Sequence, residues 1–599
     1  MDRRTILAFV LIFLVFTTYS FVMKKFYPPE TPSTAADSLA VATADPATVT
    51  PPRADGVTPA EFMAGATADS LPVPATAATT AAEALLPAAL AAPSEVRVQG
   101  PLYELTVDTR GGRIVSWHGL EYDSHTGEPV QLVPATIPAR GNEALLFRSA
   151  ELDLSSLVYT ADKPAVTLRE GEGAISLTLS AQTRGGFEVR KIFTFRPDMY
   201  GIEVDWVLAA AGGRAHPALD LTGTPEDFRF GWNQGIAPTE RNQKMEQTAL
   251  RSLARVGDDY HYKKQNGLHK NADKVTDQWR GSVQFAGLQN RYFTIVGIVP
   301  REQGEPVEGS IRVGGDTETM TQSWAIDVPA RRGVGDEIAV ARLDMYIGPQ
   351  RTELLSSYGV GLEETMDLGW KVFRPLAKIV LVGLNFMHRY IPNYGLIIII
   401  FSVLTKLAFY PLTKSSTASM KKMQDLQPKL KALQEKYKND KEKLNQATMK
   451  LYQEEKVNPL AGCLPLLVQS PVFIALYQAL NHTIALRGQP FVLWIKDLSQ
   501  PDAIATLPFA LPLLGNDLNV LPILMSVAMY FQTKFTPSSA AGGQMAMMNT
   551  MLPLVMIFIF YNMPSGLVLY WLVNTIMQGY QSWQIHRTAA PVGGGTQTA

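Results

Sequence analysis

Hydrophobic and polar residues change their spacing several times along the chain. Residues 5–23 are nearly all apolar and follow Arg3 and Arg4, which predicts a membrane-spanning anchor within residues 1–27. A cleaved signal peptide begins in a similar way, but no pair of small residues at cleavage spacing follows, so we favour an uncleaved anchor. Residues 28–97 are dominated by Ala, Thr and Pro. Such a composition cannot bury enough apolar surface to fold, and it predicts a flexible linker.

Apolar residues alternate with polar ones from residue 98 to residue 350. Ile202, Val204 and Trp206 are one such run, and glycine-rich turns such as Arg184-Gly185-Gly186 separate the runs. Many short strands of period two, with no helical spacing between them, predict an antiparallel β-sandwich. Because this domain follows an anchor whose N-terminus is cytoplasmic, we expect it outside the membrane.

Residues 365–391 change to a helical spacing. Apolar residues recur at steps of three and four from Phe373 to Ile391, while Lys378 and Asn385 fall on the other side. This two-faced pattern predicts a helix lying in the outer membrane interface. A helix packed on the β-sandwich is the alternative.

Five apolar segments then follow within residues 392–585, the predicted helical core. Each is close to the lower length limit for a spanning helix. With the anchor they predict a six-span bundle with both termini in the cytoplasm, and residues 586–599 are expected to be a disordered cytoplasmic tail. The segments are Gly395–Leu412, Leu464–Ile484, Leu518–Phe535, Met545–Met563 and Leu567–Trp583.

The loop between the first two of these segments, residues 414–459, is rich in lysine. It holds eleven lysines, no arginine and six acidic residues. Excess positive charge keeps such loops in the cytoplasm. Its apolar positions predict a helical hairpin that turns at Lys438-Asn439-Asp440, with Pro428 as a kink in the first arm. The hairpin either enforces topology alone or also docks a polyanion or an acidic emerging chain.

Lys406 is the one charged residue in the first of these apolar segments, Gly395–Leu412, and lies six residues before its end. An ionised lysine at a helix centre is costly, so its side chain either reaches the lipid headgroups or faces a hydrated cavity in the bundle. Polar residues on the other segments favour the cavity, although they could also be interhelical hydrogen-bonding groups. They include Ser402, Gln469, Ser470, Ser526, Asn574, Thr575 and Gln578.

Several function classes are excluded or disfavoured by what the chain lacks. The net charge is −1, which gives no overall field for nucleic acid, and the single cysteine, Cys463, cannot form an intrachain disulfide. No Walker-type phosphate loop, HExxH motif or G-x-S-x-G elbow is present. The predicted spans carry no carboxylate, which argues against a proton-coupled transporter.

Several longer motifs resemble the YidC family of membrane protein insertases, in its Gram-negative bacterial form. They run in family order over roughly residues 370–585, and they include Tyr410-Pro411-Leu412-Thr413, Pro465-Leu466-Leu467-Val468-Gln469 and Pro564-Ser565-Gly566-Leu567. In the sandwich region the resemblance depends on position and architecture alone. It implies a periplasmic β-supersandwich beside the helical core.

The resemblance implies a non-enzymatic insertase and folding chaperone in the bacterial inner membrane. It acts without nucleotide or cofactor on newly made membrane proteins, alone or with the Sec translocon, and the ribosome is a weaker expected partner. A hydrophilic groove takes the substrate's polar tail, and Lys406 aligns with the family's groove arginine. The implied groove residues are Lys406, Ser402, Gln469, Ser470, Asn574 and Thr575. The implied substrate-sliding residues are Phe473, Tyr570 and Trp571, and the hairpin lysines are Lys421, Lys422, Lys429 and Lys431.

Two other functions stay open from the sequence. One is a solute channel or transporter with an exported binding domain. The other is a carbohydrate enzyme, because similar supersandwiches occur in sugar epimerases, and this rests on fold analogy alone.

Overall fold

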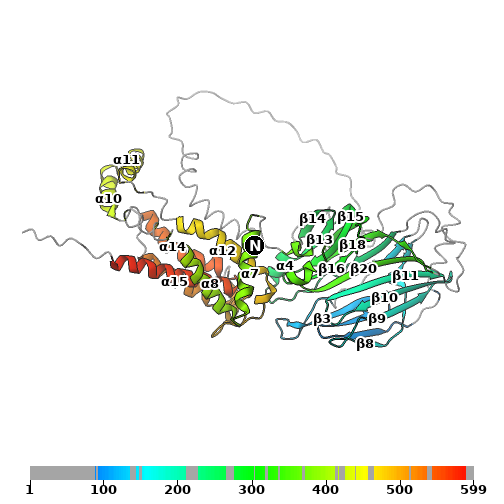
Figure 1. The fold of residues 1–599 in the computed structure, drawn as a ribbon. Coiled ribbons are helices and arrows are strands. Elements are labelled where there is room, and N and C mark those ends of the chain that lie inside the picture. Colours follow the sequence, from blue (N-terminus) through cyan, green and yellow to red (C-terminus); the bar gives the residue numbers. More distant parts are fainter. Residues whose placement is uncertain are drawn as a thin grey trace, which may run out of the picture. The chain divides into compact units, whose positions relative to one another are not determined.

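A computed structural model gives the fold, which divides into two compact units at Thr365 and Met366. The structure describes residues 88, 92–134, 143–146, 151–210, 227–264, 276–302, 304–316, 321–334, 337–366, 372–411, 416, 422, 425–438, 440–455, 457, 464–511, 514–535 and 543–588. The predicted anchor, most of the predicted linker and residues 589–599 of the predicted tail lie outside these ranges. Each unit is described by itself (Figure 1).

The first unit is built almost entirely from β-strands, which confirms the predicted antiparallel sandwich. Its strands are β1 (Glu95–Gln99), β2 (Tyr103–Asp108), β3 (Arg113–Asp123), β4 (Pro129–Gln131), β5 (Ala144–Leu146), β6 (Glu151–Asp153), β7 (Thr160–Ala161), β8 (Ala165–Thr167), β9 (Ile175–Gln182), β10 (Phe187–Phe195), β11 (Gly201–Ala210), β12 (Asp227–Trp232), β13 (Arg251–Val256), β14 (Asp259–Lys264), β15 (Thr276–Gln289), β16 (Phe293–Ile298), β17 (Val307–Asp316), β18 (Thr321–Pro329), β19 (Arg331–Arg332) and β20 (Glu337–Pro349). The short helices are η1 (Leu154–Ser156), α4 (Gln243–Ala249), α6 (Thr352–Ser356) and η2 (Leu362–Thr365).

These strands form two sheets. The smaller has the order β4-β3-β2-β1-β8, and β1 and β8 are parallel in it. The larger has 15 strands and runs β6-β5-β12-β18-β17-β15-β16-β20-β11-β10-β9-β7, with β13, β14 and β19 beside this path. β1 begins at Glu95, a few residues before the predicted end of the linker.

Period-two burial explains why these segments are strands. Along β10 the side chains alternate strictly between buried and half-buried, so one face of the sheet joins the core. The core is tight enough to require glycine where an aromatic ring crosses a strand. A Cβ added at Gly297 would lie 2.5 Å from the Trp324 ring, so only glycine fits there.

The second unit is mainly helical. Its elements are α7 (Arg374–His388), α8 (Tyr394–Ala408), α10 (Gln427–Lys436), α11 (Lys441–Glu454), α12 (Leu464–His482), η4 (Ile484–Leu486), β21 (Ala503–Leu511), β22 (Gly515–Asn519), α13 (Leu521–Phe535), α14 (Gly543–Phe560) and α15 (Ser565–Thr588). α15 packs against α13 and α8, α13 packs against α14, and α7 packs against α12. One hydrophobic cluster joins all six of these helices.

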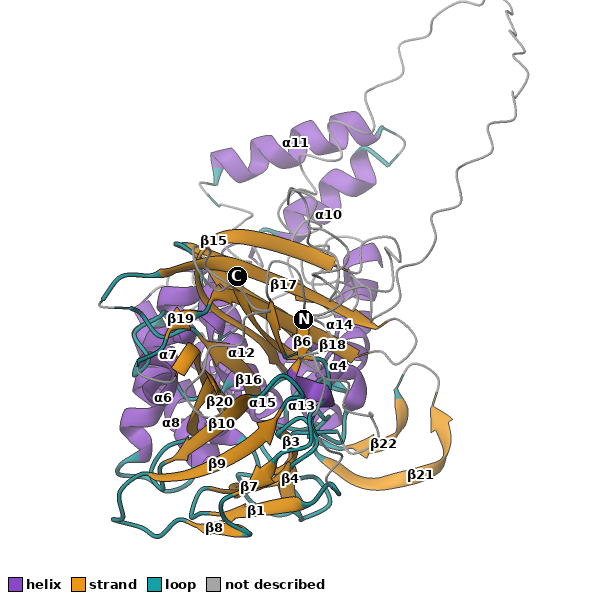
Figure 2. Cartoon of the chain, turned by 90° about the vertical axis from the view of Figure 1, so that its right-hand side faces the viewer, coloured by secondary structure: helices purple, strands orange, loops and turns teal. Residues whose placement is uncertain are grey.

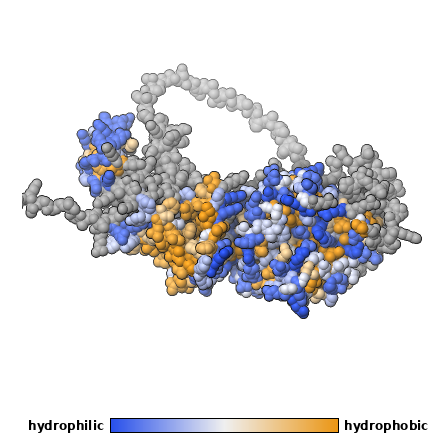
Figure 3. Space-filling view, in the orientation of Figure 1, coloured by the Kyte–Doolittle hydropathy of each residue, from blue (hydrophilic) through white to orange (hydrophobic). Residues whose placement is uncertain are grey.

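Apolar side chains also cover the outside of this unit. Examples are Leu407 on α8, Phe531 on α13 and Phe558 on α14, each more than half exposed. Figure 3 shows such residues gathered over the helical unit. Among the helices of the described ranges, none combines the length and the apolar character that crossing a membrane requires.

α7 has two apolar sides. Its buried residues Ala377, Val380 and Leu384 belong to the core of the helical unit, as the predicted helical face requires. A second row, Ile379, Val382 and Phe386, is exposed. The helix is shorter than the predicted range 365–391, and it begins with Pro375 in its first turn, where proline is tolerated.

The lysine-rich loop forms the predicted pair of helices, α10 and α11. The second helix begins at an Asp440 cap, whose carboxylate accepts from the Lys443 backbone N–H at 3.0 Å. Pro428 lies in the first turn of α10, so the predicted kink is instead the start of a helix. Leu426 and Val457 form a small cluster of their own, and Tyr452 packs against it.

The segment before α13 differs from the prediction. A third apolar helix was expected from Leu518, but residues up to Asn519 belong to β22, and a two-stranded hairpin, β21–β22, precedes the helix. The sequence analysis predicted no strand before this helix, because the hydrophobicity of the segment does not distinguish a hairpin from a loop.

Candidate functional site

Lys406 lies inside the helical unit. Its side chain is only 5% exposed, and its Nζ donates to Gln578 Oε1 at 2.6 Å, which joins α8 to α15. The side chain therefore points between helices rather than outward along α8. Of the two predicted orientations, the packing favours the interior one.

A second set of hydrogen bonds joins α12 to α15. Gln469 Nε2 donates to Asn574 Oδ1 at 3.0 Å and lies 3.4 Å from the Tyr570 hydroxyl. Asn574 Nδ2 in turn donates to the Tyr570 carbonyl oxygen at 2.9 Å. Thr575, beside Asn574, is also buried, and Ser470 is half-buried. Three helices thus contribute polar side chains to one region, which we call the polar cluster: Lys406, Gln469, Asn574 and Gln578.

Ser402 is fully buried one turn before Lys406, but its hydroxyl donates to the Ile398 carbonyl of its own helix at 2.7 Å. The proton of this hydroxyl is therefore used within α8. Ser526 donates to the Pro553 carbonyl at 2.9 Å and joins α13 to α14. This bond is interhelical, as the alternative interpretation of the polar residues expects.

The positive charge of the polar cluster is hydrogen-bonded to an amide. Within the described part of the chain, no carboxylate lies at ion-pair distance from the Lys406 Nζ, and the neutral amide of Gln578 is its hydrogen-bond partner. A buried ammonium held by an amide oxygen keeps its attraction for an incoming anion, because no fixed anion competes with it.

The spacing along α15 explains the place of Tyr570. Tyr570, Asn574 and Gln578 follow one another at four-residue steps, so they share one helix face. Tyr570 is 1% exposed on that face and lies 3.4 Å from Gln469. The structure therefore groups Tyr570 with the polar cluster.

Phe473 and Trp571 form a different contact. Their rings meet edge to face at 4.7 Å between centroids, and Phe560 of α14 lies 5.2 Å from Trp571. Of the three predicted sliding residues, the structure brings together Phe473 and Trp571, and Tyr570 lies on the next face of α15.

The predicted hairpin lysines are partly described. Lys421 lies outside the described ranges, while Lys422, Lys429 and Lys431 are exposed. Lys429 Nζ lies 2.5 Å from Glu455 Oε1, so it joins the start of α10 to the end of α11. Lys429 therefore stabilises the hairpin, and Lys431 remains open to solvent.

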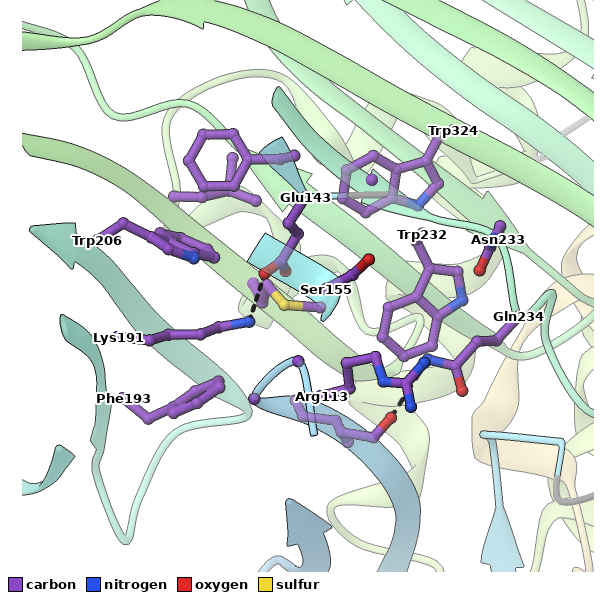
Figure 4. Close-up of a pocket in the computed structure, with 17 residues that line it drawn as sticks. Arg113, Glu143, Ser155, Lys191, Phe193, Trp206, Trp232, Asn233, Gln234 and Trp324 are labelled. Atoms are coloured by element: carbon purple, nitrogen blue, oxygen red, sulfur yellow. Dashed lines mark hydrogen bonds and ion pairs between the residues drawn. The ribbon is translucent and has the colours of Figure 1, made fainter. Parts of the chain in front are cut away.

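The β unit holds a pocket that the sequence analysis missed. It lies on the large sheet beneath the Gly111-Gly112 turn, and Figure 4 shows Lys191, Glu143 and three tryptophans around it. Lys191 Nζ lies 2.7 Å from Glu143 Oε2 and within 5.1 Å of the Phe193 and Trp206 ring centroids. Burial raises the pKa of Glu143 and lowers the pKa of Lys191.

A sequence signal for this pocket does exist. In β10, every second residue is buried, and Lys191 lies on this buried face. The other residues of the face are apolar: Phe187, Val189, Phe193 and Phe195. A lysine on the apolar side of a strand predicts a buried partner of opposite charge.

Within the described ranges, no group of three or more His, Cys, Asp or Glu side chains is placed to hold a metal ion.

Comparisons with known proteins cover both units. A family described as "60Kd inner membrane protein" matches residues 386–591, and one described as "YidC periplasmic domain" matches residues 95–381. The chain is 34% identical to a membrane protein insertase YidC of Pelobacter propionicus over 98% of this chain and 99% of the relative. It is 32% identical to that of Syntrophus aciditrophicus over 98% of this chain and 100% of the relative.

A solved structure of an active YidC insertase, with its first transmembrane domain resolved, aligns with 83% of this chain and 94% of that chain. The identity is 18% and the TM-score is 0.35. The relationship to this family therefore depends on the sequence matches.

Proposed function

Because the chain belongs to the YidC family of membrane protein insertases, we propose that its polar cluster receives the polar end of a membrane protein as that protein enters the bilayer. Bacterial inner-membrane location and a periplasmic domain follow from the same membership. The single observation that carries the proposal is the buried Lys406, which is hydrogen-bonded to a neutral amide between α8 and α15.

The physical role of this lysine is to lower the cost of moving polar groups through a hydrocarbon layer. A short acidic tail meets a cation in a region of low dielectric, where their attraction is stronger than in water. Gln469, Asn574 and Gln578 offer further hydrogen-bonding groups along the same side of the bundle. The surrounding polar groups form the proposed hydrophilic groove, with Ser402, Ser470 and Thr575 beside them.

The apolar part of the substrate follows a different surface. We assign this surface to Phe473 and Trp571, whose rings contact each other where α12 meets α15. Burial of the substrate's apolar residues in lipid supplies the driving force, so no nucleotide is required. The absence of a phosphate-binding motif from the sequence supports this point.

The proposed topology has six spans, both termini in the cytoplasm and the β unit in the periplasm. The lysine excess of residues 414–459 and the exposed apolar side chains of the helical unit support it. The exposed Lys422 and Lys431 offer a cationic surface to an emerging chain or to the ribosome. We also propose cooperation with the Sec translocon and chaperone activity. Only the family resemblance supports these two points.

Reconstitution in liposomes tests the role of Lys406. The substrate is a single-span protein with a short acidic tail, and the measured quantity is the fraction protected from added protease. We expect Lys406→Glu to insert about tenfold more slowly than Lys406→Arg, which corresponds to roughly 1.4 kcal/mol of lost attraction.

Lys264→Glu makes the same charge change at an exposed position of the β unit, and it should insert like the unaltered protein. Equal rates for Lys406→Glu and Lys406→Arg would remove charge from the mechanism. If the unaltered protein inserts the substrate no faster than protein-free vesicles do, the proposed insertase function is wrong.

A further inference from the structure

The hairpin β21–β22 is an apolar arm without a core of its own. From Ala503 to Gly515 the sequence contains no charged residue. Ile504 is 49% exposed and Phe509 is 59% exposed, and Pro508 between them is also exposed. Figure 2 shows β21 and β22 standing clear of the helices of their unit. A two-stranded hairpin of this kind is marginally stable in water, so its exposed surface needs a partner.

The base of the arm is fixed to the helix ends. Asp502 is buried, and its Oδ2 accepts from the backbone N–H groups of Val520 and Leu521 at 3.0 and 2.6 Å. The same oxygen accepts from Trp494 Nε1 at 2.9 Å. These three bonds hold the start of β21 against the N-terminus of α13. A negative group is favoured there by the helix dipole.

A second set of bonds fixes the other strand. Asn519 Nδ2 donates to the Tyr561 carbonyl oxygen at 2.6 Å, and the Tyr561 hydroxyl donates to the Asp517 carbonyl oxygen at 2.8 Å. The arm therefore leaves the bundle in a defined direction, at the end where α12 and α14 finish and α13 and α15 begin. Its exposed residues are presented by a rigid base.

Other apolar groups are exposed next to this base. Leu493 has a positive φ of 56° and is 86% exposed, an unfavourable backbone conformation for leucine, and Val492 beside it is 49% exposed. On α13, Ile523 and Leu524 are partly exposed directly after the arm. The apolar surface of the arm thus continues the apolar outside of the helical unit.

We infer that the β21–β22 arm lies in the boundary between lipid headgroups and acyl chains, with Ile504 and Phe509 inserted among the lipids. Three observations favour lipid over a protein partner. The arm's one charged residue, Asp517, accepts from the Thr506 hydroxyl within the arm at 3.0 Å, and residues 503–516 have no charge to select a partner. The apolar surface of the arm is continuous with that of α13, and the chain is an inner-membrane protein. This inference depends on the membrane location and is independent of the role of the polar cluster.

Spin labels on the full-length protein in lipid nanodiscs test this inference. In a Cys463→Ser background, Ile504→Cys and Phe509→Cys each receive one nitroxide. Val334→Cys is the matched control, because Val334 is an exposed apolar residue of the β unit, 85% accessible. Power-saturation spectra then compare collisions with oxygen, which concentrates in lipid, and with a water-soluble nickel chelate.

We expect both arm labels to show a higher ratio of oxygen to nickel collisions than the Val334 label. Nickel collisions as frequent as at Val334 would place the arm in water and overturn the inference. Shielding from both reagents would mean that protein covers the arm, either this chain or a second copy, and would overturn it as well. Agreement between the two label positions guards against a local disturbance at one of them.

Discussion

At the scale of single residues, two buried lysines are stabilised by different means. Lys191 is paired with Glu143 at 2.7 Å and lies over two aromatic rings, so its charge is neutralised within the β unit. Lys406 has the Gln578 amide as its partner. A neutralised charge contributes to the fold, whereas a charge held by an amide retains attraction for a ligand. We therefore propose a substrate-binding role for Lys406 and a structural role for Lys191.

Glu246 provides a pH-dependent residue in the β unit. Its carboxylate accepts from the backbone N–H groups of Thr239 and Glu240 at 2.7 to 3.0 Å and ties residues 239–240 to α4. Burial raises the pKa of Glu246 from 4.5 to about 7. The folded form therefore binds a proton more tightly than the unfolded form does. The resulting stability is fully present below pH 4.5 and is lost as the pH rises through about 7.

We predict that the opening free energy of residues 236–250 falls by roughly 3 kcal/mol between pH 4.5 and pH 8. Hydrogen–deuterium exchange of the full-length protein, corrected for the intrinsic exchange rate, measures it. Glu246→Gln should remove the dependence, since its amide does not titrate in this range. Glu104→Gln, at an exposed position of β2, should keep it. A slope that survives in Glu246→Gln assigns the effect to another group.

At the scale of elements, position within a helix turn decides the role of neighbouring residues. Along α15, Tyr570 and Asn574 share one face, and Trp571 belongs to the next. Gly579 faces α13, and a Cβ added there would lie 3.8 Å from Gln532 Cβ, which is an ordinary van der Waals contact. The same helix thus supplies polar groups, an aromatic contact and a packing surface for α13.

Asp502 is the residue on which the start of α13 depends. We predict that Asp502→Ala destabilises the helical unit by about 2 kcal/mol, because two backbone donors and the Trp494 N–H lose their shared acceptor. Asp502→Asn keeps one acceptor oxygen and should lose less. Denaturation by SDS, followed by circular dichroism, measures the change.

Asp259→Ala is the control for this series, since Asp259 is exposed in β14. It should leave the transition of the helical unit unchanged. An Asp502→Ala protein as stable as the unaltered one would show that water replaces the lost acceptor.

At the scale of the whole molecule, each unit has its own core, divided at Thr365 and Met366. The β unit is held by sheet hydrogen bonds and a tight aromatic core, and the helical unit by one cluster that joins six helices. The chain has a single cysteine, so neither unit depends on an intrachain disulfide.

We predict that the lysine hairpin and the β unit label from opposite sides of the membrane. In a Cys463→Ser background, a membrane-impermeant maleimide should modify Lys443→Cys in inverted vesicles only. It should modify Lys264→Cys in right-side-out vesicles only. Both lysines are exposed, so both cysteines should react after solubilisation in detergent, which is the control. Labelling of both from one side would contradict the proposed topology.

The sequence by itself determined the features that repeat locally. Alternation predicted that residues 98–350 are built from strands. Three- and four-residue steps predicted the helices α7, α10 and α11, and an isolated charge in an apolar segment pointed to Lys406. These features were predictable because each depends only on which residues are near in the chain. The hairpin before α13 was not predicted because its apolar residues do not alternate with polar ones, so no strand period marks it.

Only the tertiary structure decided which distant residues meet. It paired Lys406 with Gln578, 172 positions away, and Lys191 with Glu143, and it placed Tyr570 beside Gln469. No local period encodes such pairs, since they arise from the packing of α15 against α8 and α12 and from the order of strands in the large sheet. Periodicity says which side of an element is buried, and packing decides what that side touches.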